Sequence, residues 1–305
     1  MAVEFHITLP TRARRRRTFP EHLTDPARPV PGHAPADPYD HIAQVARAAE
    51  LAGLSGAVVP FDPDGEESFI VAGGVLRRSR YLRVVAEFHP AIATPVYAAK
   101  LSVSLARFSG DRLDWKLGDL DPLTARAHGD FLDGPERHRR AAEFLTIAKG
   151  VWSQSGFTYE GRYFQVLEGG FASVLDDGVP SPLGGRPFPR VHLAGTSPEE
   201  LDLSAEHADV HLFDPWDDIE SAVERLPGLK YGVRLRVAAR EDAAEARGLE
   251  GDLVGSYDNV AAGIREFVSR GITIFHLDAS PHLEETYRIG EHLLPLLTKE
   301  SADVH

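Results

Sequence analysis

The sequence predicts an α/β protein whose strands close into a (β/α)8 barrel, and three observations indicate this fold. Segments with strand patterns alternate with segments with helix patterns along the whole chain. Each kind occurs eight times, and right-handed crossovers join such units most simply into a closed barrel. The alternative, a doubly wound open sheet, lacks the Gly-x-Gly-x-x-Gly turn that would support it.

The strands are recognised by two patterns. Residues 3–9 alternate with period two, as in a strand with one buried face. Residues 56–61, "GAVVPF", form a short apolar run that is typical of a parallel strand covered on both faces. The other predicted strands span residues 82–90, 112–119, 190–195, 210–213, 231–239 and 273–279.

The helices are recognised by spacing and by their ends. Residues 38–53 carry apolar side chains on one helical face and stop at a glycine. Ser197 and Pro198 form a good helix start, with acidic residues after them. The other predicted helices span residues 68–79, 94–110, 134–154, 218–226, 259–271 and 281–297, and the last of these closes the ring.

One segment interrupts this alternation after the fourth helix. Residues 157–166 have the pattern of a hairpin that turns at Glu160-Gly161, and a Pro/Gly-rich loop follows at 176–189. We therefore expect one barrel domain over residues 1–305, with a small hairpin insertion at 155–189. A chain of 305 residues that is 43% hydrophobic is long enough to bury such a core.

Composition excludes several classes of protein. The chain has no cysteine, so disulfides, thiolate nucleophiles and cysteine metal sites are excluded. A net charge of -13 disfavours nucleic-acid binding. The sequence has neither an apolar run of membrane-spanning length nor a secretory signal pattern, and we expect a cytoplasmic protein.

A basic run, Arg12 to Arg17, follows the first strand and opposes the acidic composition. Three interpretations stay open for it. It is a solvated loop, an anion-collecting loop at the mouth of a site, or an arm that binds nucleic acid.

Several segments of the chain resemble the bacterial luciferase-like flavin monooxygenases, and the alkanesulfonate monooxygenase branch most of all. They include "HIAQVARAAELAGLSGAVVP", "HGDFLDGPERHRRAAEF", "PRVHLAGTS" and "SPHLEETYRIGEHLLPLL". The resemblance covers nearly the whole chain in matching order. It implies a TIM-type barrel, reduced FMN from a separate flavin reductase, O₂ as co-substrate, and a homodimer or homotetramer or a related partner subunit.

The resemblance also suggests where the cofactor phosphate binds. Gly195, Thr196 and Ser197 match the family's phosphate segment at the end of a strand. Backbone N–H groups at a helix start attract phosphate, although plain helix capping explains the same residues. His138 stands where the family has a tyrosine near the phosphate.

The fourth strand departs from the family pattern Asn-x-x-Thr-Gly. Trp115 takes the place of the asparagine, and Asp119 takes the place of the glycine. The indole is expected either to stack on the cofactor ring or to fill its space. The carboxylate of Asp119 would repel a phosphate.

The seventh strand predicts an anion site. Arg234 matches a family arginine near the substrate, and Arg236 replaces a histidine. Alternation points both side chains to one side of the strand, so we expect a sulfonate, carboxylate or phosphate ligand. Both arginines are expected to act in catalysis, by binding the substrate anion or the charge that develops on the flavin peroxide. The alternative is pairing with Asp or Glu of neighbouring strands, Glu87 or Asp278 for instance. His89, where close relatives have arginine, is expected to assist catalysis.

Other rim positions differ from the alkanesulfonate enzymes. Arg12 replaces a histidine, Gly65 a cysteine, and Ser280 a tyrosine, while Glu66 adds an acid. We expect Arg12, Glu66 and Ser280 to line the substrate site, and the substrate to be a small anion. Only residues 241–258 remain of the family's lid.

Two alternatives to a monooxygenase stay open. One is a non-catalytic barrel subunit that has lost flavin binding, and the other is a repurposed barrel with non-redox or deazaflavin chemistry. A metal site from His6 and His276 with Asp278 or Glu87 is a weak further possibility, and no metal is expected.

Overall fold

The computed structural model describes residues 3–12, 38–91, 93–118, 120–171 and 184–298. Eight parallel strands form a closed barrel, as predicted. Each strand pairs with the next around the ring, and the pairing of β8 with β9 closes it. In order around the barrel they are β1 (Glu4–Thr8), β2 (Gly56–Val59), β3 (Arg83–Phe88), β4 (Leu113–Leu117), β7 (Val191–Ala194), β8 (Val210–Phe213), β9 (Lys230–Arg240) and β11 (Ile272–Asp278).

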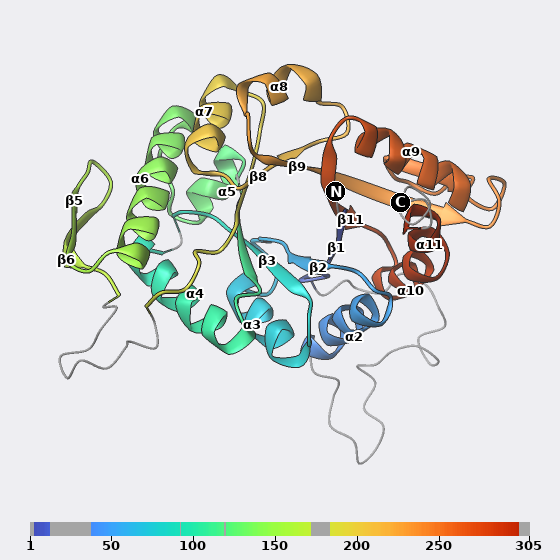
Figure 1. The fold of residues 1–305 in the computed structure, drawn as a ribbon, viewed down its shortest axis with the longest axis horizontal. Coiled ribbons are helices and arrows are strands. Elements are labelled where there is room, and N and C mark those ends of the chain that lie inside the picture. Colours follow the sequence, from blue (N-terminus) through green and yellow to red (C-terminus); the bar gives the residue numbers. More distant parts are fainter. Residues whose placement is uncertain (1–2, 13–37, 92, 119, 172–183, 299–305) are drawn as a thin grey trace, which may run out of the picture.

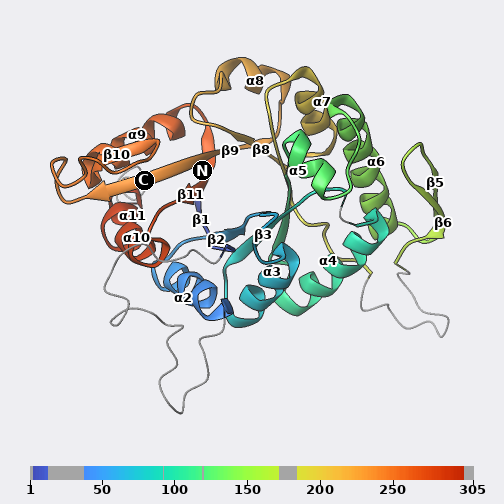
Figure 2. The ribbon, with the colours of Figure 1, turned by 180° about the vertical axis from the view of Figure 1, so that it is seen from behind.

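Helices form a ring outside the strands (Figures 1 and 2). They are α2 (Pro38–Leu51), α3 (Ser68–Arg78), α4 (Pro95–Ser109), α6 (Gly134–Ser153), α7 (Pro198–His207), α8 (Ile219–Arg225), α9 (Tyr257–Ser269), α10 (His282–Arg288) and α11 (Leu294–Thr298). The short helix α5 (Pro122–Ala127) was not predicted, and it lies inside this ring as seen in both views.

The segment expected to be one closing helix is divided in the structure. α10 passes into a π-helical turn, η1 (Ile289–Leu293), and then into α11. A side chain at Gly290 would overlap Ala52 at the end of α2. The glycine therefore lets the last helical segment approach α2 closely, which closes the ring.

Two pieces lie outside the barrel. The predicted hairpin is present as β5 (Phe157–Glu160) and β6 (Gln165–Gly169), which pair antiparallel beside α6. The segment 241–258, expected to be the remainder of a lid, contains β10 (Leu253–Ser256), which pairs with the end of β9. The sequence pattern did not reveal β10.

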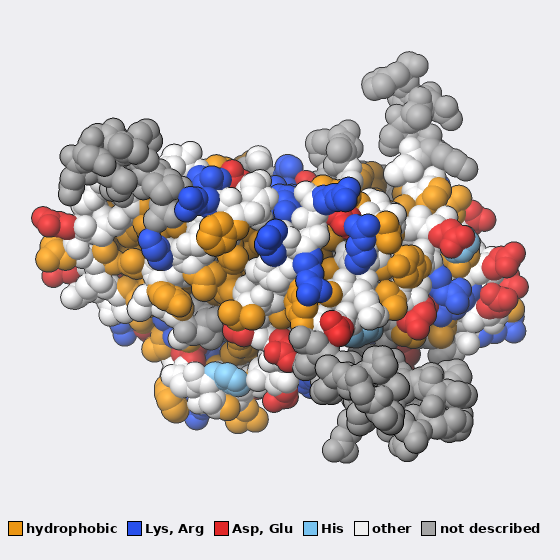
Figure 3. Space-filling model, turned by 90° about the horizontal axis from the view of Figure 1, so that it is seen from below, with side chains coloured by type: hydrophobic (Ala, Val, Ile, Leu, Met, Phe, Trp, Pro, Cys, Tyr) orange, Lys and Arg blue, Asp and Glu red, His pale blue; other side chains and the backbone are white. Residues whose placement is uncertain are grey.

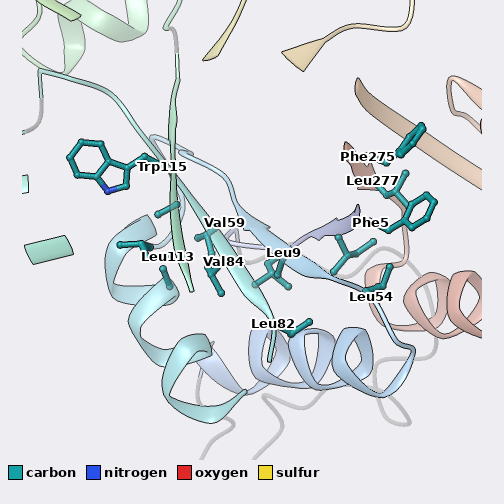
Figure 4. Packing of buried hydrophobic residues seen from close by; sticks show 14 of the residues in the cluster. Phe5, Leu9, Leu54, Val59, Leu82, Val84, Leu113, Trp115, Phe275 and Leu277 are labelled. Carbon is teal, nitrogen blue, oxygen red and sulfur yellow. The ribbon is translucent and has the colours of Figure 1, made fainter. Parts of the chain in front are cut away.

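The hydrophobic core lies between strands and helices. Every second strand residue points outward into it, including Val59, Val84 and Leu113 (Figure 4). Phe5 and Phe275 stack there with ring centroids 5.2 Å apart. This alternation leaves the other strand residues to fill the inside of the barrel, which we call the lumen.

The lumen is closed at the amino ends of the strands by four charged side chains, which we call the floor: Glu4, Arg83, Asp114 and Arg190. Arg190 donates to both Glu4 oxygens at 2.9 Å and to Asp114 at 2.7 Å. Arg83 donates to the other Asp114 oxygen at 2.5 Å. These charge-assisted bonds cross-link strands that are far apart in sequence.

The outer face of α2, α3 and α4 carries mixed side chains. Figure 3 shows this side of the molecule, with basic and hydrophobic groups interspersed. Ile70, Tyr97 and Phe108 are its most exposed large apolar side chains. Across the described ranges, no helix combines the length and apolar character needed to cross a membrane.

Candidate active site

A pocket of about 90 Å³ opens at the carboxyl ends of β3, β4 and β7. The N-terminal part of α6 and the first turn of α7 complete its wall. Its polar lining comes from His89, Arg137, His138, Arg140 and Glu200. This is the end of a (β/α)8 barrel at which active sites are built. The volume suits a phosphate-sized group, since pockets for whole cofactors are about 300–1,000 Å³.

A buried ion pair forms one wall of the pocket. Arg140 donates to both Asp130 oxygens, at 2.9 and 2.7 Å. His89 Nε2 lies 3.6 Å from Asp130, and its Nδ1 accepts a bond from the Ala91 N–H, so the ring proton resides on Nε2. Burial raises the pKa of Asp130, but the hydrogen bonds from Arg140 and the Leu132 N–H, together with the charge of Arg140, outweigh it and leave the pKa below its usual value.

The start of α7 forms the opposite wall. Ser197 caps the helix by accepting the Glu200 N–H at 3.3 Å, and Glu200 accepts the Ser197 N–H at 2.9 Å. This reciprocal arrangement is a capping box. Gly195 has a φ of +116°, and a side chain there would overlap the Glu200 carboxylate. Glycine is therefore required at position 195 both by the positive φ and by the close approach of the Glu200 carboxylate.

The predicted phosphate residues come together around Glu200. His138 Nε2 lies 3.9 Å from its carboxylate, so the α6 histidine does face the α7 helix start. Thr196 is exposed beside them. The groups here that suit an oxyanion are a helix start, two guanidinium groups and an imidazole, and the carboxylates of Glu200 and Asp130 already engage them.

An ion pair also lies in the lumen near its mouth. Lys116 Nζ is 2.5 Å from Glu87, and both side chains are largely buried. A side chain at Gly118 would contact the Glu87 carboxylate at 2.9 Å. Lys116 is thus the inward-facing residue of β4 closest to the pocket.

Comparison with known proteins identifies the family of the chain. A model described as luciferase-like monooxygenase matches residues 4–250. The chain belongs to this luciferase-like monooxygenase family. Its pocket lies among the β3, β4, β7 and α7 segments, all inside the matched range.

Solved structures share the fold at low identity. The EDTA monooxygenase from Chelativorans sp. BNC1 is 13% identical, with a TM-score of 0.75, covering 98% of this chain and 94% of that one. A riboflavin lyase solved with modified FMN and riboflavin is 15% identical, with a TM-score of 0.76, covering 99% and 92%. The F420-dependent tetrahydromethanopterin reductase from Methanopyrus kandleri is 14% identical, with a TM-score of 0.73, covering 98% and 100%.

The side chain of Trp115 does not lie where the family resemblance led us to expect it. It is fully buried on the outer side of β4, and its indole N–H donates to Ser102 at 2.8 Å. It packs edge-on against Phe88 and Phe188, with centroids 5.1 and 5.0 Å away. The expectation that it meets the cofactor ring is wrong, because alternation turns Lys116 inward and Trp115 outward. Asp119 lies outside the described residues.

The two β9 arginines separate. Arg234 donates to Asp214 at 2.9 Å at the carboxyl end of β8, and its side chain is 41% exposed. Arg236 is 61% exposed and lies 3.5 Å from Asp252, in the segment before β10. Both arginines therefore lie beside acidic residues, although these are neither Glu87 nor Asp278, and only Arg234 remains close to the barrel mouth.

The remaining predicted substrate residues lie on rim loops. Arg12 binds Asp62 through two hydrogen bonds of 2.8 and 2.5 Å and Asp64 through one of 2.9 Å. The Glu66 N–H donates to the Thr11 carbonyl at 3.0 Å, so these two loops are joined. Ser280 is exposed after β11. Residues 13–17 of the basic run lie outside the described residues.

The weak metal hypothesis is not supported. His6 and His276 do stack in the lumen, 5.3 Å apart, and His192 lies 5.3 Å from His276. Glu87 instead pairs with Lys116, and Asp278 lies 3.7 Å from His282. Among the residues that the structure describes, no group of three such side chains is arranged to hold a metal ion.

Three site features escaped the sequence analysis: the Arg140–Asp130 pair, the Lys116–Glu87 pair and the capping role of Glu200, which was noted only as an acid after the helix start. The first two join residues on different elements and leave no local pattern. The third had a signal, because Ser-x-x-Glu at a helix start is the sequence form of a capping box.

Proposed function

We propose that this protein is a flavin-dependent monooxygenase that uses reduced FMN and O₂ on a small anionic organic substrate. The observation that carries the proposal is the oxyanion pocket at the strand ends, in a chain that matches a luciferase-like monooxygenase model over residues 4–250. When bound, the reduced flavin supplies the electrons that activate oxygen.

The residues present fit the phosphate end of such a cofactor. A carboxylate already accepts the Ser197 N–H at 2.9 Å, so the α7 start does hold an oxyanion. Arg137, His138 and Arg140 add positive charge or hydrogen-bond donors on the α6 side. We assign Gly195, Thr196, Ser197 and His138 to cofactor binding, and no role there to Trp115.

His89 is positioned to donate a hydrogen bond beside this pocket. Its ring is almost completely buried, and Ala91 and Asp130 hold its orientation. A fixed Nε2–H is suited to stabilising negative charge on a bound reactant. Buried surroundings also limit the access of water.

Arg234 is our candidate for binding the substrate anion. One of its guanidinium nitrogens bonds Asp214, and the side chain is partly open at the mouth. Arg12, Glu66 and Ser280 lie on rim loops and are proposed as outer substrate contacts. With Arg12, Gly65 and Ser280 in place of the usual residues, we propose a relative of the alkanesulfonate enzymes with a different anionic substrate.

We further propose that a separate flavin reductase supplies the reduced cofactor and that the chain forms a homodimer or homotetramer. The exposed apolar residues of α3 and α4 offer a face for self-association. Light scattering coupled to size-exclusion chromatography tests the assembly, and a monomer at micromolar concentration contradicts it.

The central test is an anaerobic titration with reduced FMN, followed by admission of oxygen. We expect saturation at about tens of micromolar or below, and reoxidation kinetics that differ from those of free reduced FMN. The variant His89→Gln tests the catalytic role of His89, and it should still bind the flavin but change the reoxidation kinetics or the product yield. A lack of binding at tens of micromolar would overturn the proposal.

A second candidate is deazaflavin-dependent hydride transfer. The likeness to an F420-dependent reductase, at a TM-score of 0.73, favours keeping it. The same pocket would then hold the phosphate of F420. Tight binding of reduced F420, weak binding of reduced FMN and no oxygen uptake would favour this candidate over the first.

A further inference from the structure

The carboxylate of Glu200 occupies the position at which the α7 start would bind a phosphate. It accepts the Ser197 N–H at 2.9 Å, and the Ser197 hydroxyl accepts the Glu200 N–H at 3.3 Å. The N–H groups of Ser197 and Glu200 are thereby engaged within the chain. A phosphate at this place must displace Glu200 or lie against its negative charge.

A second feature of the pocket points to a missing ligand. Arg140 lines the pocket and is only 8% exposed. Its two terminal nitrogens bond Asp130, but its Nε has no hydrogen-bond partner among the described residues. An unpaired guanidinium nitrogen at this depth costs free energy, so a bound acceptor would stabilise it.

The charges around the pocket already balance. Arg140 and Arg137 lie at 2.7 and 3.4 Å from Asp130, and His138 lies 3.9 Å from Glu200. Two guanidinium groups thus lie beside Asp130, the second carboxylate, Glu200, lies beside His138, and the two positive charges equal the two negative ones. A phosphate added without movement of Glu200 gives the site excess negative charge, whereas one that replaces Glu200 does not.

We propose that Glu200 is a built-in competitor for the phosphate of the cofactor, so that this protein discriminates little between FMN and the phosphate-free flavin riboflavin. This inference rests on the proposed flavin function. Binding of the phosphate requires Glu200 to leave the α7 start, and part of the favourable phosphate interaction is spent in displacing it.

The test compares three forms of the full-length protein. Glu200→Gln keeps an oxygen that can accept the Ser197 N–H but removes the charge. Glu199→Gln removes the same charge from an exposed neighbour in the same helical turn, and is the matched control. Reduced FMN and reduced riboflavin are titrated anaerobically against each form, and melting temperature is measured with and without about 10 mM inorganic phosphate.

We expect the wild type and Glu199→Gln to bind FMN and riboflavin within about threefold of each other. Glu200→Gln should prefer FMN by about tenfold or more, and phosphate should raise the melting temperature of this variant alone. A wild type that prefers FMN by tenfold or more, unchanged by Glu200→Gln, overturns the inference while leaving the proposed function intact. An equal increase in FMN preference in Glu200→Gln and Glu199→Gln also overturns the inference, because it indicates a general charge effect.

If no form binds either flavin, the proposed function fails and inorganic phosphate decides the inference alone. A phosphate-dependent rise in melting temperature that is confined to Glu200→Gln still supports Glu200 as the competitor in the pocket. No rise in any form overturns it.

Discussion

The two ends of this barrel use charged residues differently. At the floor, Asp114 has no exposed surface and binds two arginines, and Arg190 links it to Glu4. At the carboxyl mouth, Arg234 makes one bond to Asp214 and remains partly open to solvent. The buried Arg234 Nε lacks a partner within the described part of the chain.

This difference separates charged residues that stabilise the fold from charged residues that remain able to bind a ligand. At the floor, several strong bonds offset the cost of removing ions from water. At the mouth, an arginine with an unused hydrogen-bond donor can still bind an anionic ligand. The same residue type therefore has a structural role at one end of the barrel and a proposed binding role at the other.

The largest expected effect is at the floor. Asp114→Asn removes the negative charge that Arg83 and Arg190 share, and should lower the free energy of unfolding by about 3–5 kcal/mol. Urea denaturation measures it. Asp64→Asn, an exposed acid beside Arg12, is the control and should change little. Equal small losses in both variants would contradict the structural role of the floor.

The second effect is acid sensitivity from buried histidines. Burial lowers the pKa of His211 to about 4, and it also lowers the pKa values of His192 and His276. In the unfolded chain histidine titrates near 6.5, so the unfolded state gains protons first as the pH falls. The contribution of these neutral histidines to the free energy of unfolding is fully present above pH 6.5. It is lost as the pH falls from 6.5 to about 4, and for His211 alone the loss is about 3 kcal/mol.

Urea denaturation at pH 8, 6.5 and 5 checks this dependence. His211→Gln should flatten the curve, whereas His41→Gln, at an exposed position on α2, should leave it unchanged. A wild-type stability that is constant down to pH 5 would show that these histidines charge without unfolding the barrel.

The third prediction tests the position of Trp115. Trp115→Phe removes the donor to Ser102 and leaves a small cavity, so it should cost about 1–3 kcal/mol. Flavin affinity should not change, because Trp115 lies outside the pocket lining. Trp216→Phe, at a side chain that is 74% exposed, is the control for stability. Lost flavin affinity with unchanged stability would restore the original cofactor role.

The smallest effect compares the two β9 arginines. Arg234→Ala should weaken the binding of an anionic substrate by about tenfold, or about 1.4 kcal/mol. Arg236→Ala removes an arginine two residues away that is directed to Asp252, and should leave affinity unchanged. Steady-state KM and direct binding measure both. Equal effects would mean that the mouth has no special anion site at Arg234.

The strand order and most helices could be predicted because periodicity is a local property. The π-turn at residues 289–293 was not visible, because no local pattern marks it, and its Gly290 packs against Ala52 far away in the chain. β10 was missed because its four residues form a strand only by pairing with β9.

The candidate site was predictable only where a local motif marks it. The Gly195–Ser197 segment and His138 were recognised, and the structure places Ser197 and His138 on either side of Glu200. Trp115 was misplaced because counting along a motif does not establish which side of the strand a residue faces. A shift of one residue exchanges inside and outside, and Lys116 occupies the lumen instead.

The sequence by itself determined the eightfold alternation, the barrel and the family resemblance, because each depends on patterns between nearby residues. Only the tertiary structure decided which charges are satisfied: Glu200 at the α7 start, Asp130 between Arg140 and His89, and Asp114 between Arg83 and Arg190. Electrostatic pairing depends on distances between separate elements, and these are set only when the strands close into the barrel.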